Sequence, residues 1–145
     1  MASSSQSKVC FFFKTKVSLH DRTWLKRFIE AIFKREKRKL RSLNFIFCND
    51  KDLLEINRRY LKHDYYTDII TFELSDKEDP VEGEVYISID RVIDNAKMLG
   101  VPAFKELHRV IFHGVLHLCG YMDKSKEEKK KMRHTEELLL LNYFN

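Results

Sequence analysis

The chain has 145 residues, of which 43% are hydrophobic and 34% are charged. This composition is typical of one globular domain and excludes a largely disordered chain. No run of about 18 apolar residues occurs, so we expect no membrane-spanning helix. Lysine and arginine number 27 against 22 acidic residues. The moderate positive charge permits a polyanionic partner but also favours solubility, so it does not by itself identify a function.

Sequence features of a secreted protein are missing. The stretch MASSSQSK lacks the charged, then apolar, then small-residue order of a signal peptide. The three cysteines, Cys10, Cys48 and Cys119, are odd in number and widely spaced, which argues against a disulfide framework. We therefore expect a reducing, cytoplasmic environment.

Two strands and two helices are expected in the first part of the chain. The stretch VCFFFKTKV begins apolar and then alternates, which predicts a strand over residues 9–17. Asp21 is a suitable cap for an amphipathic helix over residues 21–39. The apolar stretch LNFIF predicts a strand over residues 43–47. An Asn-Asp pair then favours the start of a short helix over residues 49–60.

Two further strands precede three helices. The stretches TDIITFEL and EVYISI predict strands over residues 67–74 and 84–89, because they are rich in β-branched and aromatic residues. An aspartate cap and a terminating glycine indicate a helix over residues 90–99. A first-turn proline opens the next helix, over residues 102–119. An S-x-x-E capping box predicts the last helix, over residues 125–141.

The order of these elements, βαβαββααα, predicts the fold class. Neither an internal repeat nor a linker divides the chain, so we expect a single domain over residues 1–145. An α+β domain with a small mixed four-stranded β-sheet, packed with about five helices, fits this order best.

The stretch HGVLHLCGYMDK, over residues 113–124, has the spacing of a metal site. His113 and His117 lie four residues apart and therefore on one face of a helix. Gly120 suits a left-handed helix exit, after which Asp123 can turn back toward the histidines. These offsets match the metzincin pattern H-E-x-x-H-x-x-G-x-x-H. We predict that His113, His117 and Asp123 bind one metal ion; the alternative is that Asp123 only caps the following helix.

One departure from the metzincin pattern bears on the substrate. Gly114 occupies the position of the glutamate that serves those proteases as general base. A metal ion can still activate water by charge alone, but a peptide also needs a proton for its poor amine leaving group. A phosphodiester is less dependent on that carboxylate, so the pattern favours phosphodiester over peptide hydrolysis.

Other polar residues of this helix have ordinary interpretations. Cys119 lies about 200° around the helix from His117 and is predicted to pack in the core. Glu106 could orient a ligand or a water, but an exposed helix carboxylate is the preferred interpretation. His20, His63, His108 and His134 have no partner at ligand spacing. We expect them to lie on the surface or to be hydrogen-bonded in the core.

Three blocks of the sequence resemble the YbeY family of bacterial endoribonucleases. The first is the histidine stretch, similar to the family pattern H-G-x-L-H-L-x-G-Y. The second, NRRYLKHDYYTDIITF, resembles N-x-x-[FY]-R-x-x-D-x-x-T-D-V-L-S-F, and the third, GEVYIS, resembles G-D-I-x-I-S. Most relatives have histidine where Asp123 stands. Leu61 replaces an arginine that the family is thought to use near the phosphate, and Arg59, or else Arg58, is the candidate to take over its catalytic role.

The resemblance implies a zincin-like fold that binds Zn²⁺ or another divalent transition metal. It also implies cleavage of single-stranded RNA, in 16S rRNA 3′-end maturation and ribosome quality control, with rRNA and the ribosome as partners. Two alternatives stay open: a zincin-like metalloprotease, and a ribosome-assembly protein whose metal is structural. We further expect basic surface beside the site, from the cations of residues 34–41 and 124–133. The oligomeric state is left open.

Overall fold

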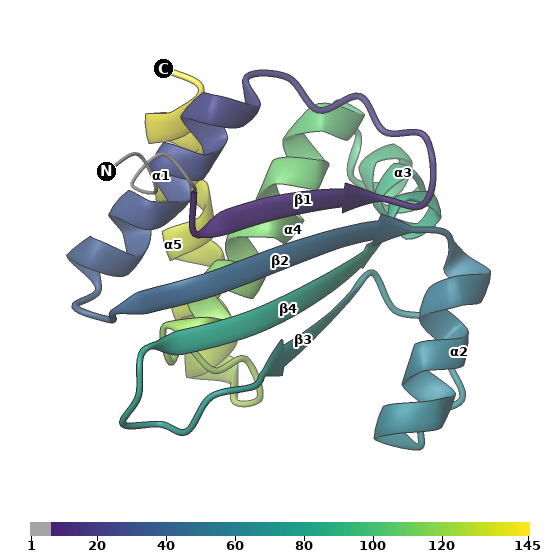
Figure 1. Ribbon diagram of the computed structural model, residues 1–145. Helices are drawn as coiled ribbons and strands as arrows, with labels where there is room; N and C mark the ends of the chain where they lie inside the picture. Colours follow the sequence, from purple (N-terminus) through teal and green to yellow (C-terminus); the bar gives the residue numbers. More distant parts are fainter. Residues whose placement is uncertain (1–6) are drawn as a thin grey trace.

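The computed structural model describes residues 7–145, which build one mixed four-stranded sheet with five helices around it (Figure 1). The strands are β1 (Val9–Phe13), β2 (Leu40–Cys48), β3 (Ile69–Glu73) and β4 (Val81–Ser88). Their order across the sheet is β1-β2-β4-β3. β1, β2 and β4 run parallel, and β3 pairs antiparallel with β4. The predicted fold class is thereby confirmed. The start of the predicted domain and most of the MASSSQSK stretch lie outside the described residues.

The helices cover the two faces of the sheet unequally (Figure 1). They are α1 (Arg22–Arg35), α2 (Asp50–Leu61), α3 (Ile89–Leu99), α4 (Ala103–Leu118) and α5 (Lys126–Tyr143). The large core contains buried residues of α1, α4 and α5 together with one face of the strands. α2 packs on the other face, where a small core holds Cys48, Leu53 and Ile70. None of the helices within residues 7–145 is long and apolar enough to cross a bilayer.

Strand alternation divides the side chains between these two cores. Phe45 and Phe47 of β2 and Val85 of β4 are fully buried in the large core. Cys48 of β2 points to the opposite face, because successive strand residues alternate. α4 lies across the face that carries the large core and contacts both β3 and β4. The helix that carries the two histidines therefore rests directly on the antiparallel edge of the sheet.

Several element boundaries differ from the predicted ones. β1 ends at Phe13 rather than at residue 17, and α1 ends at Arg35 rather than at residue 39. Asp21 precedes α1 with φ 50° and makes no capping hydrogen bond through its side chain. The cap of α3 is Ser88, whose hydroxyl accepts from Arg91 N, so this helix begins one residue earlier than predicted. The predicted capping box of α5 is confirmed.

Candidate metal centre

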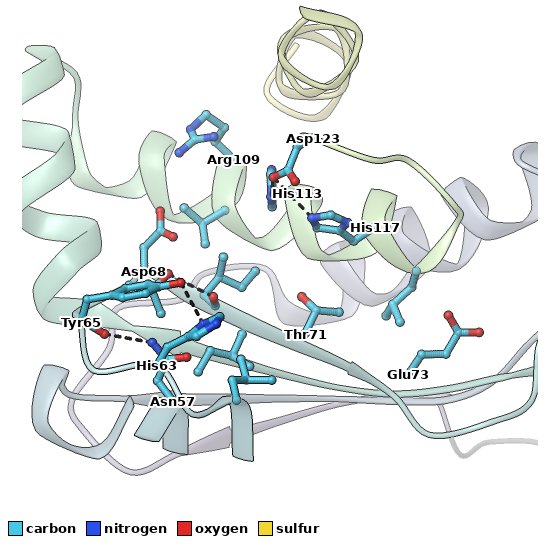
Figure 2. A pocket seen from close by; sticks show the side chains of 16 residues that line it. Asn57, His63, Tyr65, Asp68, Thr71, Glu73, Arg109, His113, His117 and Asp123 are labelled. Carbon is cyan, nitrogen blue, oxygen red and sulfur yellow. Dashed lines mark hydrogen bonds and ion pairs between the residues drawn. The ribbon is translucent and has the colours of Figure 1, made fainter. Parts of the chain in front are cut away.

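The two histidines of α4 present their imidazoles side by side (Figure 2). The ring centroids of His113 and His117 are 4.9 Å apart and the ring planes are nearly perpendicular, at 84°. Both side chains are partly exposed, at 17% and 29%. The one-turn spacing of the helix thus produces the juxtaposition that the sequence predicted.

Asp123 returns to this pair after the helix ends. Gly120 has a φ of 103°, a backbone conformation that glycine adopts at little cost, and it turns the chain back along α4. Oδ2 of Asp123 lies 3.3 Å from Nε2 of His113 and 3.5 Å from Nε2 of His117. The cap of α5 is made instead by Ser125 and Glu128. The alternative in which Asp123 only caps that helix does not describe this structure.

The three side chains fit a divalent metal. One ligand atom from each lies within 4.8 Å of the others. Metal–ligand distances of about 2.0–2.2 Å in a tetrahedral site place ligand atoms about 3.4 Å apart. The two Nε2–Oδ2 distances match that spacing. Two imidazoles and a carboxylate are also a donor set that zinc and similar transition metals accept.

A glutamate from α5 lies behind the first histidine. Oε2 of Glu136 is 2.5 Å from Nδ1 of His113, and the Glu136 side chain is only 2% exposed. Nε2 of His113 is left facing Asp123. Glu136 was not predicted from the sequence, because no local spacing relates a residue of α5 to a histidine 23 positions earlier.

An arginine joins Glu136 to a second buried carboxylate. Nη1 of Arg109 donates to Oε1 of Glu136 at 2.9 Å, while Nε and Nη2 donate to the two oxygens of Glu106 at 2.8 and 2.7 Å. These two acidic partners raise the pKa of Arg109 further above its usual value, against the opposing effect of burial. Glu106 is 2% exposed. The preferred interpretation of Glu106 as an exposed helix carboxylate is therefore wrong.

A cavity of about 630 Å³ opens in front of the histidines (Figure 2). Its other side is formed by the end of α2, the following loop and β3, including Asn57, Tyr65 and Thr71. Asp68 also lines it, accepts a hydrogen bond from Asn95 at 3.1 Å, and has its pKa raised by burial. The candidate metal ligands thus face a space that a substrate can enter.

Gly114 lies at a close contact between α4 and the sheet. A Cβ at this position would be 3.0 Å from Cδ1 of Ile69 and 3.1 Å from Cγ1 of Val85. These distances are tighter than ordinary van der Waals contacts. A side chain at position 114 would require the Ile69 and Val85 side chains to shift by a few tenths of an ångström, so packing as well as chemistry favours glycine here.

Neither arginine candidate lines the metal cavity. Arg59 is paired with Glu55 at 3.3 Å and lines a separate hollow beside Lys14 and Tyr60. Arg58 is paired with exposed Asp64. Leu61, where the family resemblance led us to expect an arginine, lines the metal cavity. The structure does not bring Arg59 together with the predicted metal ligands, and its catalytic role stays a prediction.

Cys119, which follows α4, and His108 within it both contribute to the core. Cys119 packs against the large core, and burial raises the pKa of its thiol to about 12. A thiol that resists ionisation is a poor metal ligand at neutral pH. His108 is buried, and its Nδ1 is 2.7 Å from the carbonyl of Phe104. His108 is therefore a hydrogen-bonded core histidine, which is one of the two positions expected for it; the other was the surface.

Cations gather around the turn between α1 and β2. Within the described part of the chain they line a hollow of about 860 Å³. The cationic lining residues are Lys8, Lys34, Lys37, Arg38, Lys39 and Arg41. Arg38 forms an ion pair at 3.3 Å with Glu73, which also lines the metal cavity. The basic hollow and the metal cavity are therefore neighbours joined by this pair.

The fold and this group of side chains define a small zincin-like α+β protein with a candidate metal centre. The chain belongs to the YbeY family: the profile described as endoribonuclease YbeY matches residues 12–144. The endoribonuclease YbeY of Cytophaga hutchinsonii is 47% identical over 137 residues, covering 93% of this chain and 96% of that protein. The endoribonuclease YbeY of Bacteroides thetaiotaomicron is 44% identical over 117 residues, covering 81% and 82%.

A solved structure supports the fold. The solution structure of TM1509 from Thermotoga maritima is similar with a TM-score of 0.64 and 27% sequence identity, covering 93% of this chain and 91% of that one. The family resemblance inferred from three sequence blocks is thus confirmed over nearly the whole chain.

Proposed function

We propose that this chain is a metal-dependent endoribonuclease whose single divalent ion is held by His113, His117 and Asp123. The observation that carries the proposal is a three-ligand group that faces an open cavity. Three protein ligands with an open position are typical of catalytic sites, whereas structural zinc sites are closed by four. Zn²⁺ or another divalent transition metal suits this donor set.

We propose single-stranded RNA as the substrate, and rRNA in particular. The names of the relatives support RNA cleavage. The basic hollow supports binding of a polyanion next to the site, since cations gain affinity by releasing counterions from phosphates. A role in 16S rRNA 3′-end maturation and ribosome quality control, in the cytoplasm and on the ribosome, follows only from the family resemblance and is part of this proposal.

The residues of the chain divide the chemical work. When bound, a divalent ion supplies Lewis acidity for a phosphoryl oxygen and makes water a better nucleophile. His113, His117 and Asp123 hold that ion at the inner side of the cavity. Arg109 gives three of its five N–H donors to two carboxylates, so we assign it the role of maintaining the site. Asp68, with its raised pKa, is the carboxyl group of the opposite side that is suited to exchange a proton.

The rival enzyme class is a zincin-like protease. It needs a carboxylate next to the first histidine, where this chain has Gly114, in close contact with the Ile69 and Val85 side chains. A binding protein with a structural metal is the other rival. The partly exposed ligand group and its adjoining cavity favour catalysis over this alternative.

The decisive experiment compares RNA and peptide cleavage by the metal-loaded protein. We expect cutting of single-stranded RNA that weakens as salt rises, and no cutting of casein. His113→Ala should reduce RNA cutting by at least about a thousandfold, because nearly all Lewis acidity at the site is lost. His134→Ala is the matched control, since this histidine of α5 is exposed and does not line the cavity. The proposal would be refuted if His113→Ala cut RNA as fast as the wild type. It would also be refuted if the wild type cut casein but not RNA.

A further inference from the structure

We propose that Glu136 is a positioning residue for the metal centre. It holds His113 in the tautomer that carries its proton on Nδ1, so that the Nε2 lone pair is directed toward the ion. Arg109 and Glu106 in turn fix Glu136. The inference rests on the proposed metal site, but it concerns residues of the chain that do not themselves touch the ion.

The contacts of Glu136 use both of its carboxylate oxygens. Oε2 accepts from Nδ1 of His113 at 2.5 Å, and Oε1 accepts from Nη1 of Arg109 at 2.9 Å. A carboxylate can only accept, so the nitrogen of His113 that faces it must be the donor. In a neutral imidazole the other nitrogen then has a free lone pair. That atom, Nε2, is the one that lies 3.3 Å from Oδ2 of Asp123.

The opposite end of the network prevents Glu136 from turning away. Arg109 is bound to Glu106 through two parallel N–H···O contacts, a geometry that is more directional than a single hydrogen bond. Glu106 and Arg109 both belong to α4, whereas Glu136 belongs to α5. The network therefore starts on α4, crosses to α5 and returns to α4 at His113. It ties the orientation of the imidazole to the packing of two helices.

The second histidine has no such support. Within residues 7–145, Nδ1 of His117 makes no hydrogen bond, and its contact to Asp123 is through Nε2. His117 is also more exposed than His113. A metal ligand whose free ring nitrogen is bound by a carboxylate is better oriented and more basic than one whose nitrogen faces water. We therefore assign unequal roles: His113 is the fixed ligand and His117 the adaptable one.

The charge of the network favours a cation. Two carboxylates, each 2% exposed, share one guanidinium that is 18% exposed. Arg133 approaches Glu136 only to 3.9 Å, and its side chain is half exposed. Excess negative charge that is withdrawn from water is unfavourable unless a positive charge lies near. A divalent ion at the three predicted ligands would supply that charge from the far side of His113.

A purely structural role for the network makes different predictions. If Glu136 only fastened α5 to α4, its loss would lower stability and leave the tautomer of His113 and the metal affinity nearly unchanged. Glu106 provides the internal comparison, because it is an equally buried carboxylate bound to the same arginine. It has no contact with a predicted metal ligand among the described residues.

The first experiment needs no variant. NMR of the metal-free wild-type protein, at a pH where the imidazoles are neutral, reports which ring nitrogen of each histidine carries the proton. We expect the Nδ1–H tautomer for His113 and no comparable fixed tautomer for His117. The Nε2–H tautomer at His113 would overturn the proposal.

The second experiment measures zinc affinity by competition with a chelator, independently of RNA cleavage. In Glu136→Gln a single amide oxygen must serve two donors, so either His113 or Arg109 faces an NH₂ group. We expect a loss of about 10- to 100-fold in affinity. Glu106→Gln should change affinity less than about threefold while lowering the melting temperature of the metal-free protein, and Glu137→Gln, at an exposed neighbour on α5, should change neither.

The outcomes separate this inference from the proposed function. Equal affinity losses in Glu106→Gln and Glu136→Gln, or none in either, would show that the network is only structural. If the wild type binds no zinc at all, the proposed metal site itself fails. If zinc binding behaves as expected but RNA is not cut, the endoribonuclease proposal fails and the role of Glu136 stands. Should Glu136→Gln not fold, the wild-type tautomer decides the question.

Discussion

The two sides of the metal cavity are built differently. We call α4, residues 119–125 and α5 the ligand wall, and the end of α2, residues 62–68 and β3 the outer wall. The ligand wall belongs to the large core, in which Val115 and Leu116 are fully buried. The outer wall has the small core of Cys48, Leu53 and Ile70. Outside this small core, polar contacts hold the loop of residues 62–68.

The difference separates positioning from access. Metal ligands must stay within a few tenths of an ångström of their geometry, which a well-packed element with buried hydrogen bonds can provide. In the outer wall, buried Asn57 donates to the carbonyl of Tyr65 at 2.9 Å, while Tyr65 is 56% exposed and its ring stacks on His63. Regions with little buried apolar area open at low free-energy cost. We infer that the outer wall adapts to the substrate while the ligand wall keeps its shape.

The largest expected effect is on the third ligand of the ligand wall. Asp123→Ala should lose the metal on purification, because two histidines alone leave the site incomplete. Asp123→His should retain it, since imidazole is an equally suitable donor. Metal content per chain, measured after identical purification, checks both. Asp64→Ala in the outer wall is the control, because this carboxylate is exposed and paired with Arg58. Full metal content in Asp123→Ala would mean that another group completes the site.

A pair of core substitutions tests the separation of the two walls. Leu53→Ala in the small core and Leu116→Ala in the large core each remove a fully buried side chain and should cost about 2–5 kcal/mol of unfolding free energy. Only Leu116→Ala should also weaken zinc binding, because Leu116 adjoins His117 on α4. Leu53→Ala should instead lower hydrogen-exchange protection in α2. Equal losses of zinc affinity in the two variants would contradict the division.

A smaller effect is expected from the missing cation of the outer wall. Leu61 lines the cavity at the position where the family resemblance led us to expect an arginine. Leu61→Arg should raise kcat/KM for RNA at least about tenfold, since one charge-assisted hydrogen bond to phosphate is worth roughly 1.5–3 kcal/mol. Leu61→Gln, of similar length but neutral, is the control. Arg59→Ala in the same assay tests the catalytic role predicted for Arg59: a tenfold fall supports it, and an unchanged rate refutes it.

The contrast between the walls also explains what the sequence could predict. His113, His117, Gly120 and Asp123 lie within 11 positions, so helix geometry and one turn were enough to bring them together. Their supports could not be found in this way. The partner of His113 on α5 depends on how two helices pack, and nothing local to the sequence reports it. Glu106 was wrongly predicted to be exposed. Its i,i+3 pairing with Arg109 does not by itself report that Arg109 also binds the buried Glu136 of α5.

The smallest effect concerns Asp68, a half-buried carboxyl group at the end of a mostly exposed loop. It is held by Asn95 of α3, and its backbone carbonyl accepts from Ser88 N at 2.9 Å. Burial raises the pKa of Asp68 in the folded protein. The folded state therefore binds the proton more tightly than the unfolded state, whose carboxyl has a pKa of about 3.9. As pH rises above that value, ionisation of Asp68 lowers the free energy of unfolding.

Asp68→Asn removes this ionisation and should leave the metal-free protein more stable than the wild type at neutral pH. The gain should shrink as pH falls, and vanish below the pKa of the unfolded carboxyl, because Asp68 is then protonated in both states. Chemical denaturation of the two proteins in the presence of a chelator, from pH 3.5 to 8, measures the difference. Asp64→Asn, at an exposed position of the same loop, is the control. A pH-independent difference would show that Asp68 is solvated like its neighbours, and that the outer wall has no fixed acidic group.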